Sequence, residues 1–278
     1  MTMSDPDDVY VHPRYLAGST STGDPGLRPA LDAGWEISHD ELGNVFVPAP
    51  DQRIRIGYLP EDDDALWKIA AYQQPFATPR WAAAFSTECP TEFITAFTTA
   101  LVPLHTQDDA FLHEGLGRAD DPHPVLSPLT DADWTVTDNW WISETTSPDG
   151  LAGAWYRRGA LDHNNELTSN KTRWQMWGGT GYASWYAVFS THTPSRLITA
   201  TATALADPAP VLRWKDGLRP NDPDHVTITP VRPPAPTPLD ILRARRPAPA
   251  PRTVAVPRWS TSTPSAPLPR PSRPAARR

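Results

Sequence analysis

Four groups of residues in this sequence carry side chains or backbone suited to chemistry. The single cysteine, Cys89, stands at the expected start of a helix, where the pKa of a thiol can fall. The acidic run 61–64 offers carboxylates to a cation, and the glycine-rich run 178–181 offers backbone amides to a phosphate. Eight histidines are spread along the chain, at positions 12, 39, 105, 113, 123, 163, 192 and 225.

Each group has a structural explanation that we prefer. A related stretch of the chain has Thr193 where Cys89 stands, which indicates a small residue before a helix rather than a nucleophile. Consecutive carboxylates lack the alternating spacing of a calcium loop, so we expect them to face water. The glycine run is followed by neither a lysine nor a helix, so it predicts a turn between strands, and the histidines match no zinc or HExxH spacing. We therefore predict solvated loop histidines, no catalytic residue, no metal site and no cofactor.

The tryptophans are the best candidates for a binding surface. The chain has 12 of them, and most are expected to pack in the core. On a strand, Trp140 and Trp141 would point to opposite faces, so that one ring would leave the core. We predict a binding surface around Trp140 or Trp141, with Trp177 and Tyr182 beside the glycine run as further members.

The first half of the chain alternates short apolar runs with turn residues and then changes period. Runs that read as antiparallel strands are WEISHDEL, NVFVPAP, RIRIGYL, LWKIAAY and WAAAFST. After them, Phe93, Phe97 and Leu101 stand four apart, which predicts an amphipathic helix with Pro90 at its first position. Thr193 and Glu92 are expected to help cap this helix and its counterpart.

This order of elements occurs twice. From Trp81 and Trp185, twelve of twenty-one successive positions are identical, without a gap. A period of about a hundred residues indicates a duplicated domain rather than a solenoid. The sequence predicts an α+β fold with two tandem repeats, each an antiparallel β-sheet closed by a C-terminal α-helix, packed as a pseudo-dimer. The expected boundaries are 9–105 for the first repeat, 106–122 for a linker and 123–210 for the second repeat.

The rest of the chain, 211–278, is predicted to be a disordered tail rich in proline, alanine and arginine. Of the 34 prolines, 18 follow Ala206. The net charge is −7, but nine arginines against Asp240 alone give +8 from Leu239 onward, which leaves −15 on residues 1–205. Three hypotheses stay open for the tail: a solvated spacer, a docking segment with PxxP-like pieces, or an electrostatic contact with nucleic acid. The arginines that would make such a contact include Arg243, Arg245, Arg246, Arg277 and Arg278.

Location is also constrained by composition. One cysteine excludes an internal disulfide framework, and the polar start Met1–Asp8 does not resemble a secretory leader. No window approaches eighteen uninterrupted apolar residues. We expect a cytoplasmic protein without a membrane partner.

Several stretches resemble a known family. They are VHPRYLAGS, GNVFV, PDQRIRIGYLPEDDDALWKI, TPRWAAAF and SPDG. Together they are similar to the actinomycete family called domain of unknown function 317, or SPDY after a Ser-Pro-Asp-Tyr motif. The second repeat has Gly150 in place of the tyrosine, and the first has Ala49 before Pro50-Asp51. The resemblance covers about residues 9–210 and implies no activity. Since Pro-Asp between strands favours a turn, we predict a hairpin at this motif rather than a site.

The function indicated by these patterns is that of a non-enzymatic binding or scaffold protein, which presents an aromatic surface to a protein or a small ligand. The alternative is a single-stranded nucleic-acid-binding protein that uses tail arginines and stacking aromatics. The acidic body argues against this alternative, because it repels polyphosphate. An enzyme of unrecognised type is the third hypothesis.

Overall fold

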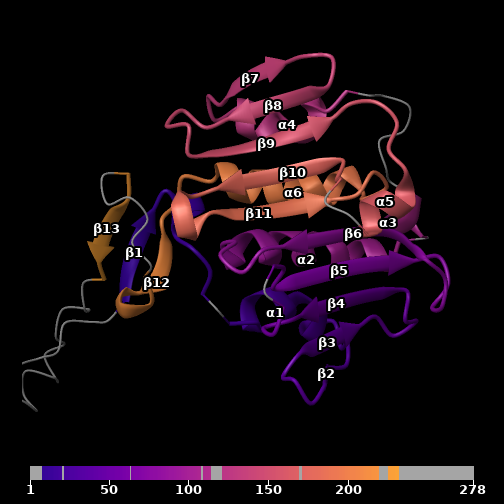
Figure 1. Cartoon of the computed structure of the whole chain (residues 1–278). Helices are drawn as coiled ribbons and strands as arrows, with labels where there is room; N and C mark the ends of the chain where they lie inside the picture. The colour runs from indigo at the N-terminus through magenta and orange to yellow at the C-terminus, as the bar shows by residue number, and fades with distance from the viewer. Residues whose placement is uncertain are drawn as a thin grey trace, which may run out of the picture. The chain divides into compact units, whose positions relative to one another are not determined.

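The computed structural model of the chain describes residues 8–20, 22–62, 64–107, 109–113, 121–168, 171–218 and 225–231. The chain divides into two units, Met1–Arg232 and Pro233–Arg278, and every described residue lies in the first. That unit contains a ten-stranded and a three-stranded antiparallel sheet with helices (Figure 1). The predicted α+β class is confirmed. The predicted tail from residue 232 onward lies outside the described residues.

Ten strands form the large sheet, five from each half of the chain. The first half supplies β2 (Ser38–His39), β3 (Val45–Pro48), β4 (Ile54–Tyr58), β5 (Trp67–Tyr72) and β6 (Pro79–Phe85). The second half supplies β7 (Thr135–Asp138), β8 (Ile142–Thr146), β9 (Ala152–Arg157), β10 (Trp174–Gly178) and β11 (Trp185–Phe189). Along these strands, side chains alternate between the two faces. On β6, for example, Trp81, Ala83 and Phe85 are buried, whereas Ala82 and Ala84 are only half-buried on the other face.

The two halves of the large sheet meet at β6 and β11, the last strand of each repeat. The order β2-β3-β4-β5-β6-β11-β10-β9-β8-β7 places equivalent strands at equal distances from this seam. At its centre Ala84 pairs with Val188, its own counterpart in the other repeat. The Ser86 hydroxyl accepts a hydrogen bond from a backbone N–H of β11 at 2.9 Å, and that of Ser190 accepts one from β6 at 3.0 Å. The seam therefore has local twofold symmetry.

We predicted a sheet for each repeat, packed as a pseudo-dimer, and the structure joins the two sheets edge to edge into one continuous sheet. The reason is that β6 and β11 would otherwise each end a half-sheet with unpaired backbone N–H and C=O groups. By pairing with each other, these two strands satisfy those groups.

The helices are distributed between the two faces and the ends of the strands. They are α1 (Asp24–Asp32), α2 (Thr91–His105), α3 (Ala110–His113), α4 (His123–Thr130), α5 (His163–Thr168) and α6 (Ser195–Ala206). In Figure 1, α1, α2, α4 and α6 lie behind the large sheet, on one face. Short 3₁₀ turns are η1 (Arg14–Leu16), η2 (Gly181–Ala183) and η3 (Lys215–Gly217).

The closing helices of the two repeats, α2 and α6, are equivalent. Each begins after a proline with nearly the same backbone angles, φ −54° and ψ 129° at Pro90 and φ −54° and ψ 130° at Pro194. We predicted that each proline would be the first residue of its helix. In the structure each helix begins one residue after the proline, at Thr91 and Ser195. Phe93 and Leu197 are each the third residue of their helix and are fully buried. Thr193 makes no side-chain capping bond to α6, contrary to expectation.

Aromatic rings connect the two halves beneath the seam. Phe97 of α2 stacks on Phe189 of β11 with ring centroids 5.7 Å apart, and it meets Phe85 of β6 edge-on at 5.6 Å. All three side chains are fully buried. The core is thus continuous across the repeats.

The Pro-Asp motifs form hairpin turns, as predicted. In the second repeat, between β8 and β9, the Ser147 hydroxyl donates to Asp149 Oδ1 at 2.6 Å and accepts from the N–H of Ala152 at 3.0 Å. Asp149 Oδ2 accepts a hydrogen bond from the Tyr15 hydroxyl at 2.7 Å. In the first repeat, between β3 and β4, Asp51 Oδ1 accepts from the N–H of Arg53 at 3.1 Å. Both motifs act as turns.

The prediction that the tail begins at residue 211 was wrong. The second sheet is formed by β12 (Val211–Trp214), β1 (Asp8–His12) and β13 (Thr227–Pro230), in that order. β1 pairs with both other strands, so it does not extend the sheet of the first repeat. We missed β12 and β13 because the sequence around them is rich in proline. Their buried face also depends on residues far apart in the chain, with Val9 and Val11 at one end and Val211 at the other. The expected linker 106–122 likewise contributes α3, whose Phe111 is buried in the large core.

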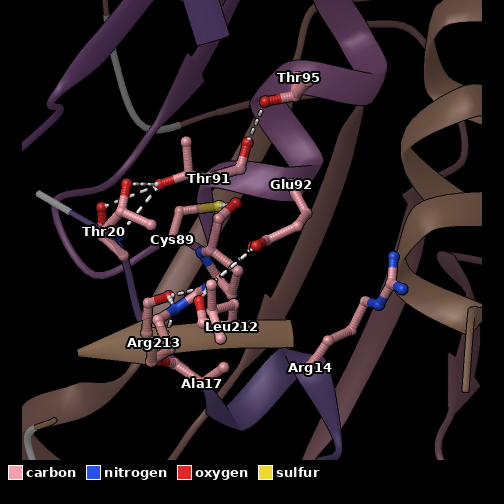
Figure 2. A network of polar contacts seen from close by, with 12 residues as sticks. Arg14, Ala17, Thr20, Cys89, Thr91, Glu92, Thr95, Leu212 and Arg213 are labelled. Atoms are coloured by element: carbon pink, nitrogen blue, oxygen red, sulfur yellow. Dashed lines mark hydrogen bonds and ion pairs between the residues drawn. The ribbon is translucent and has the colours of Figure 1, made fainter. Parts of the chain in front are cut away.

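A buried arginine attaches this small sheet to the start of α2. Arg213, with a side chain 4% exposed, pairs with Glu92, at 2.7 Å from Nη1 to Oε1 and 2.6 Å from Nη2 to Oε2. Its guanidinium also donates to the carbonyl oxygens of Ala17 and Gly18. Figure 2 shows Arg213 reaching from the strand toward Glu92, while Arg14 points away from this cluster. Glu92 was expected to cap α2, and instead it anchors Arg213.

A second arginine attaches the same region to the end of α6. Arg14 donates to the carbonyl oxygens of Ala204 and Ala209 and pairs with Asp207 at 2.7 Å. Arg213 of β12 is thus bound to the start of α2, and Arg14 of η1 to the segment at the end of α6.

Candidate ligand-binding site

One face of the large sheet is free of the four helices that cover the other. We call it the open face and define it by the outward side chains of β4, β5, β6, β11, β10 and β9. Lys68 and Arg80 are exposed there, and Ala70, Ala84 and Val188 are half-buried. In Figure 1 this is the face turned toward the viewer, opposite α1, α2, α4 and α6.

The two repeats differ in side-chain size on the open face. The strand registers align three small residues of the first repeat with three aromatic residues of the second, Gly57 with Trp155, Ala70 with Trp177 and Ala82 with Tyr186. At these three positions the first repeat leaves space above the sheet, whereas the second repeat fills it with aromatic rings.

A hollow of about 530 Å³ lies over the seam on the open face. Its floor is formed by side chains of the four central strands, Ala70, Ala82, Ala84, Val188 and Gln175. One wall comes from the β4–β5 loop, through Asp64 and Ala65, and the opposite wall from the β9–β10 segment, through Glu166, Leu167 and Thr172. These two connections occupy the same place in the two repeats, so both repeats build the hollow.

The first wall is held by a charged loop. Asp62 Oδ1 accepts from the N–H of Ala65 at 2.9 Å, and Oδ2 lies 2.6 Å from the Lys68 ammonium. The hydrogen bond from Lys68, followed by that from Ala65, lowers the pKa of Asp62 to about 2. Tyr186 donates its hydroxyl to the Asp64 carbonyl oxygen at 3.0 Å, and burial, followed by the Asp64 carboxylate, raises the pKa of Tyr186. The acidic run thus organises this wall, rather than only facing water.

The second wall contains a buried carboxylate. Glu166 of α5 is 7% exposed, and its Oε1 accepts from the N–H and the hydroxyl of Thr191 at 2.9 and 2.8 Å. Arg173 donates to the same Thr191 hydroxyl at 3.1 Å and turns its Nη1 to carbonyl oxygens outside the hollow. Thr172 is 7% exposed, and its hydroxyl has no hydrogen-bond partner among the described residues.

The residues that we considered for catalysis or redox chemistry are buried, lie in a turn or are hydrogen-bonded within the fold. Cys89 is buried, and burial, followed by the charge of Glu92, raises the pKa of its thiol. Gly179 has φ 83°, and a Cβ there would lie 2.3 Å from the Ala183 carbonyl oxygen, so the glycine run is a turn, as predicted. His163 is not a solvated loop residue, because it lies half-buried in α5 with Nε2 2.9 Å from the Pro79 carbonyl oxygen. In the described ranges no group of three or more His, Cys, Asp or Glu could hold a metal ion.

Trp140 and Trp141 are both exposed, but our argument for that exposure was wrong. They form the turn between β7 and β8, and so they do not point to opposite faces of a strand. Their ring centroids lie 3.5 Å apart with the ring planes tilted by 30°, and the side chains are 73% and 59% exposed. Asn139 fixes the turn by accepting from the N–H groups of Trp141 and Ile142.

The four predicted aromatic residues do not meet in one place. Trp177 lies at the end of β10 that pairs with Gly153, whereas the 140–141 turn lies at the opposite end, beside Arg157. Trp177 is half-buried, and its ring covers Gly153 so closely that a Cβ there would lie 2.7 Å from the ring. Tyr182 is fully exposed in η2. The tail arginines Arg243, Arg245, Arg246, Arg277 and Arg278 lie outside the described residues.

Sequence reasoning missed Trp155 and the small residues of the hollow. Trp155 stands on the open face with the Arg157 guanidinium 5.3 Å from its ring centroid. The signal was present in the strand alternation, because Ala152, Ala154 and Tyr156 point to the core and leave Trp155 outward. The same rule places Ala82 and Ala84 outward.

The fold and the site define the chain as a duplicated antiparallel sheet-and-helix protein with a hollow between its repeats. Residues 48–106 and 146–211 match the family model SPDY, a domain of unknown function (DUF317). These segments run from β3 to α2 and from β8 to β12, so the match supports both the repeat and the resemblance seen in the sequence.

The comparisons found no match among the curated proteins and none among the solved structures. None of the helices in the described ranges has the length and apolar character needed to cross a membrane.

Proposed function

We propose that this protein is a non-enzymatic binding protein whose two repeats act as a pseudo-dimer around one site for a small ligand. The observation that supports this is the hollow of about 530 Å³ over the seam. Its size falls in the range of about 300–1,000 Å³ that is typical of small-molecule sites. A mainly apolar floor with a few polar groups at its walls is also typical of such sites.

The aromatic surface of this proposal lies in the second repeat. Tyr186 lines the hollow, and Trp155 pairs across the strands with the floor residue Gln175. Gln175 is half-buried and places an amide on an otherwise apolar floor. An amide beside aromatic rings supplies both orientation and contact area to a ligand.

Filling the hollow is expected to abolish ligand binding. The Ala84→Trp variant places an indole over the centre of the floor, where the side chain is now a single methyl group. The full chain is dialysed against a small-molecule extract, and retained compounds are identified by mass spectrometry. The wild type should retain a compound that Ala84→Trp loses by about tenfold or more, the ratio for a lost contact of 1.4 kcal/mol.

The matched control is Thr137→Trp, which adds the same ring to an exposed position on β7, outside the hollow. It should retain the compound as the wild type does. If the wild type retains nothing, or if Ala84→Trp retains the same compound equally, the proposed site is wrong.

A second candidate function, single-stranded nucleic-acid binding, is favoured by the adjacent, exposed rings of Trp140 and Trp141. Exposed indole rings at a turn can stack on a base. Arg158 is close by, because its N–H donates to the Trp141 carbonyl oxygen at 2.7 Å. The charge of −15 on residues 1–205 opposes this candidate.

The double variant Trp140→Ala/Trp141→Ala tests this candidate. If the pair stacks on bases, the affinity for labelled oligothymidine, followed by fluorescence anisotropy, should fall by about tenfold or more. The control Tyr182→Ala removes an equally exposed ring elsewhere and should leave the affinity unchanged. Equal affinities of all three proteins, at low and at physiological salt, would exclude the pair as a base-stacking site.

A further inference from the structure

We infer that the hollow binds an aliphatic polyamine, a methylene chain with ammonium groups at or near its ends. This inference rests on the proposed function and names the ligand class of the same site. It is carried by two features of the hollow: a carboxylate in each end wall and an apolar floor between them.

The α5 end of the hollow is built to receive a hydrogen-bond donor with positive charge. Thr191 fixes Glu166 through Oε1 alone, and no described residue donates to Oε2. A carboxylate that is 7% exposed needs a partner for its remaining lone pairs. Thr172, in the same wall, has a buried hydroxyl without a partner among the described residues. An ammonium group has three donors, enough for both oxygens.

The opposite end of the hollow is acidic as well. Asp64 lines it, and its backbone carbonyl oxygen accepts a hydrogen bond from the Tyr186 hydroxyl at 3.0 Å. Lys68 is the cation among the lining residues, and Asp62 compensates it at 2.6 Å. The carboxylates of Asp64 and Glu166 lie at opposite ends, and Lys68 pairs with neither; Arg173, outside the lining, reaches Glu166 only through the Thr191 hydroxyl.

The floor between these ends suits methylene groups. Ala70, Ala82, Ala84 and Val188 present methyl groups, and the Leu167 side chain adds to one wall. Tyr186, at one end, lies in β11, and Thr191, which holds Glu166 at the other, lies in the turn that follows the end of this strand. A chain with ammonium groups at both ends can thus span the hollow, with its apolar part on the floor. Aromatic rings beside the floor attract ammonium groups further.

Charge on the whole folded region acts in the same direction. Residues 1–205 carry −15, so organic cations are concentrated near this region and anions are repelled. An anionic ligand of the same length would place its charge against Glu166 or Asp64. The lining charges consequently select a cation over an anion.

Isothermal titration calorimetry with spermidine as the probe, and the full chain as the protein, tests this inference. Glu166→Gln keeps an oxygen to accept from Thr191 but removes the charge, and it should weaken spermidine binding by roughly 30-fold or more. Asp64→Asn changes a more exposed carboxylate and should weaken binding about two- to fivefold. Hexane-1,6-diol, which has similar methylenes but no charge, should not bind.

The matched control is Glu144→Gln, which removes a carboxylate of the same sheet face outside the hollow. It should bind spermidine within about twofold of the wild type, because Glu144 does not line the hollow and solvent screens charges outside it. Should Glu166→Gln loosen α5, Ala84→Trp gives an independent answer. It fills the floor without touching the Glu166–Thr191 contact, and it must also abolish binding.

Two results would overturn the inference: spermidine binding that is equal in Glu166→Gln and the wild type, or no spermidine binding by the wild type. In the second case, a different compound that the wild type retains and Ala84→Trp loses would leave the proposed function intact. A lysine-rich peptide that binds the hollow while spermidine does not would also reject the polyamine. If the wild type retains no compound at all, both proposals fail together.

Discussion

Replacing Arg213 with methionine is expected to lower the free energy of unfolding by about 3–5 kcal/mol. The guanidinium is almost completely buried and neutralises Glu92 through two short contacts. Its removal leaves that carboxylate and the carbonyl oxygens of Ala17 and Gly18 without their donor. Urea unfolding of the wild type and the variant, followed by circular dichroism, measures the difference.

The control for this prediction is Arg28→Met, which breaks the exposed Arg28–Asp32 pair of α1. Exposed pairs contribute little, so this change should stay within about 1 kcal/mol. The double variant Arg213→Met/Glu92→Leu should recover part of the loss, because no buried charge remains. Equal effects of Arg213→Met and Arg28→Met would contradict the anchoring role that we assign to Arg213.

Phe97→Ala is the second large change that we expect, with a loss of about 3–5 kcal/mol of unfolding free energy. Phe97 is fully buried and contacts Phe85 and Phe189, one ring from each side of the seam. Its removal opens a cavity beneath both repeats. The variant should unfold in one transition at lower urea concentration, because both halves share this core.

Thr99→Ala, on the exposed side of the same helix, is the matched control and should change stability by no more than about 0.5 kcal/mol. Near-ultraviolet circular dichroism and tryptophan fluorescence should report the same midpoint for Phe97→Ala. Two separate transitions would mean that each repeat unfolds by itself, against the continuous core described above.

The sequence predicted the local elements of the repeats well, because their signals are local. Alternation along β4 and β6, a change to helical spacing at Phe93, and turn chemistry at Pro50-Asp51 and Pro148-Asp149 depend on neighbouring residues. Duplication strengthened these signals, since each appears twice.

The errors arose where the outcome depends on residues that are distant in sequence. Nothing near Ala84 indicates that its strand pairs with Val188, more than a hundred positions later. The strand at Val211 forms only because β1, at the other end of the described chain, lies beside it. Trp140 and Trp141 were misplaced for a different reason, since apolar aromatic residues are typical of strands and here occupy a turn.

The candidate site was only partly predictable for the same reason. An outward Trp155 follows from alternation in its own strand. The hollow requires four strands from two repeats and walls from two loops, and only the pairing of β6 with β11 brings them together.

The hollow lies over the Ala84–Val188 pair, on the local twofold axis, and this position bears on the orientation in which a ligand would bind. A pair of identical subunits with a site on their symmetry axis presents the same groups in both directions, so a bound molecule can enter either way round. Here the halves are joined in one chain, and their side chains at this axis have diverged, with alanine on one side and tyrosine on the other at positions 82 and 186. The proposed site is therefore asymmetric, and a ligand bound in it would meet different side chains at its two ends.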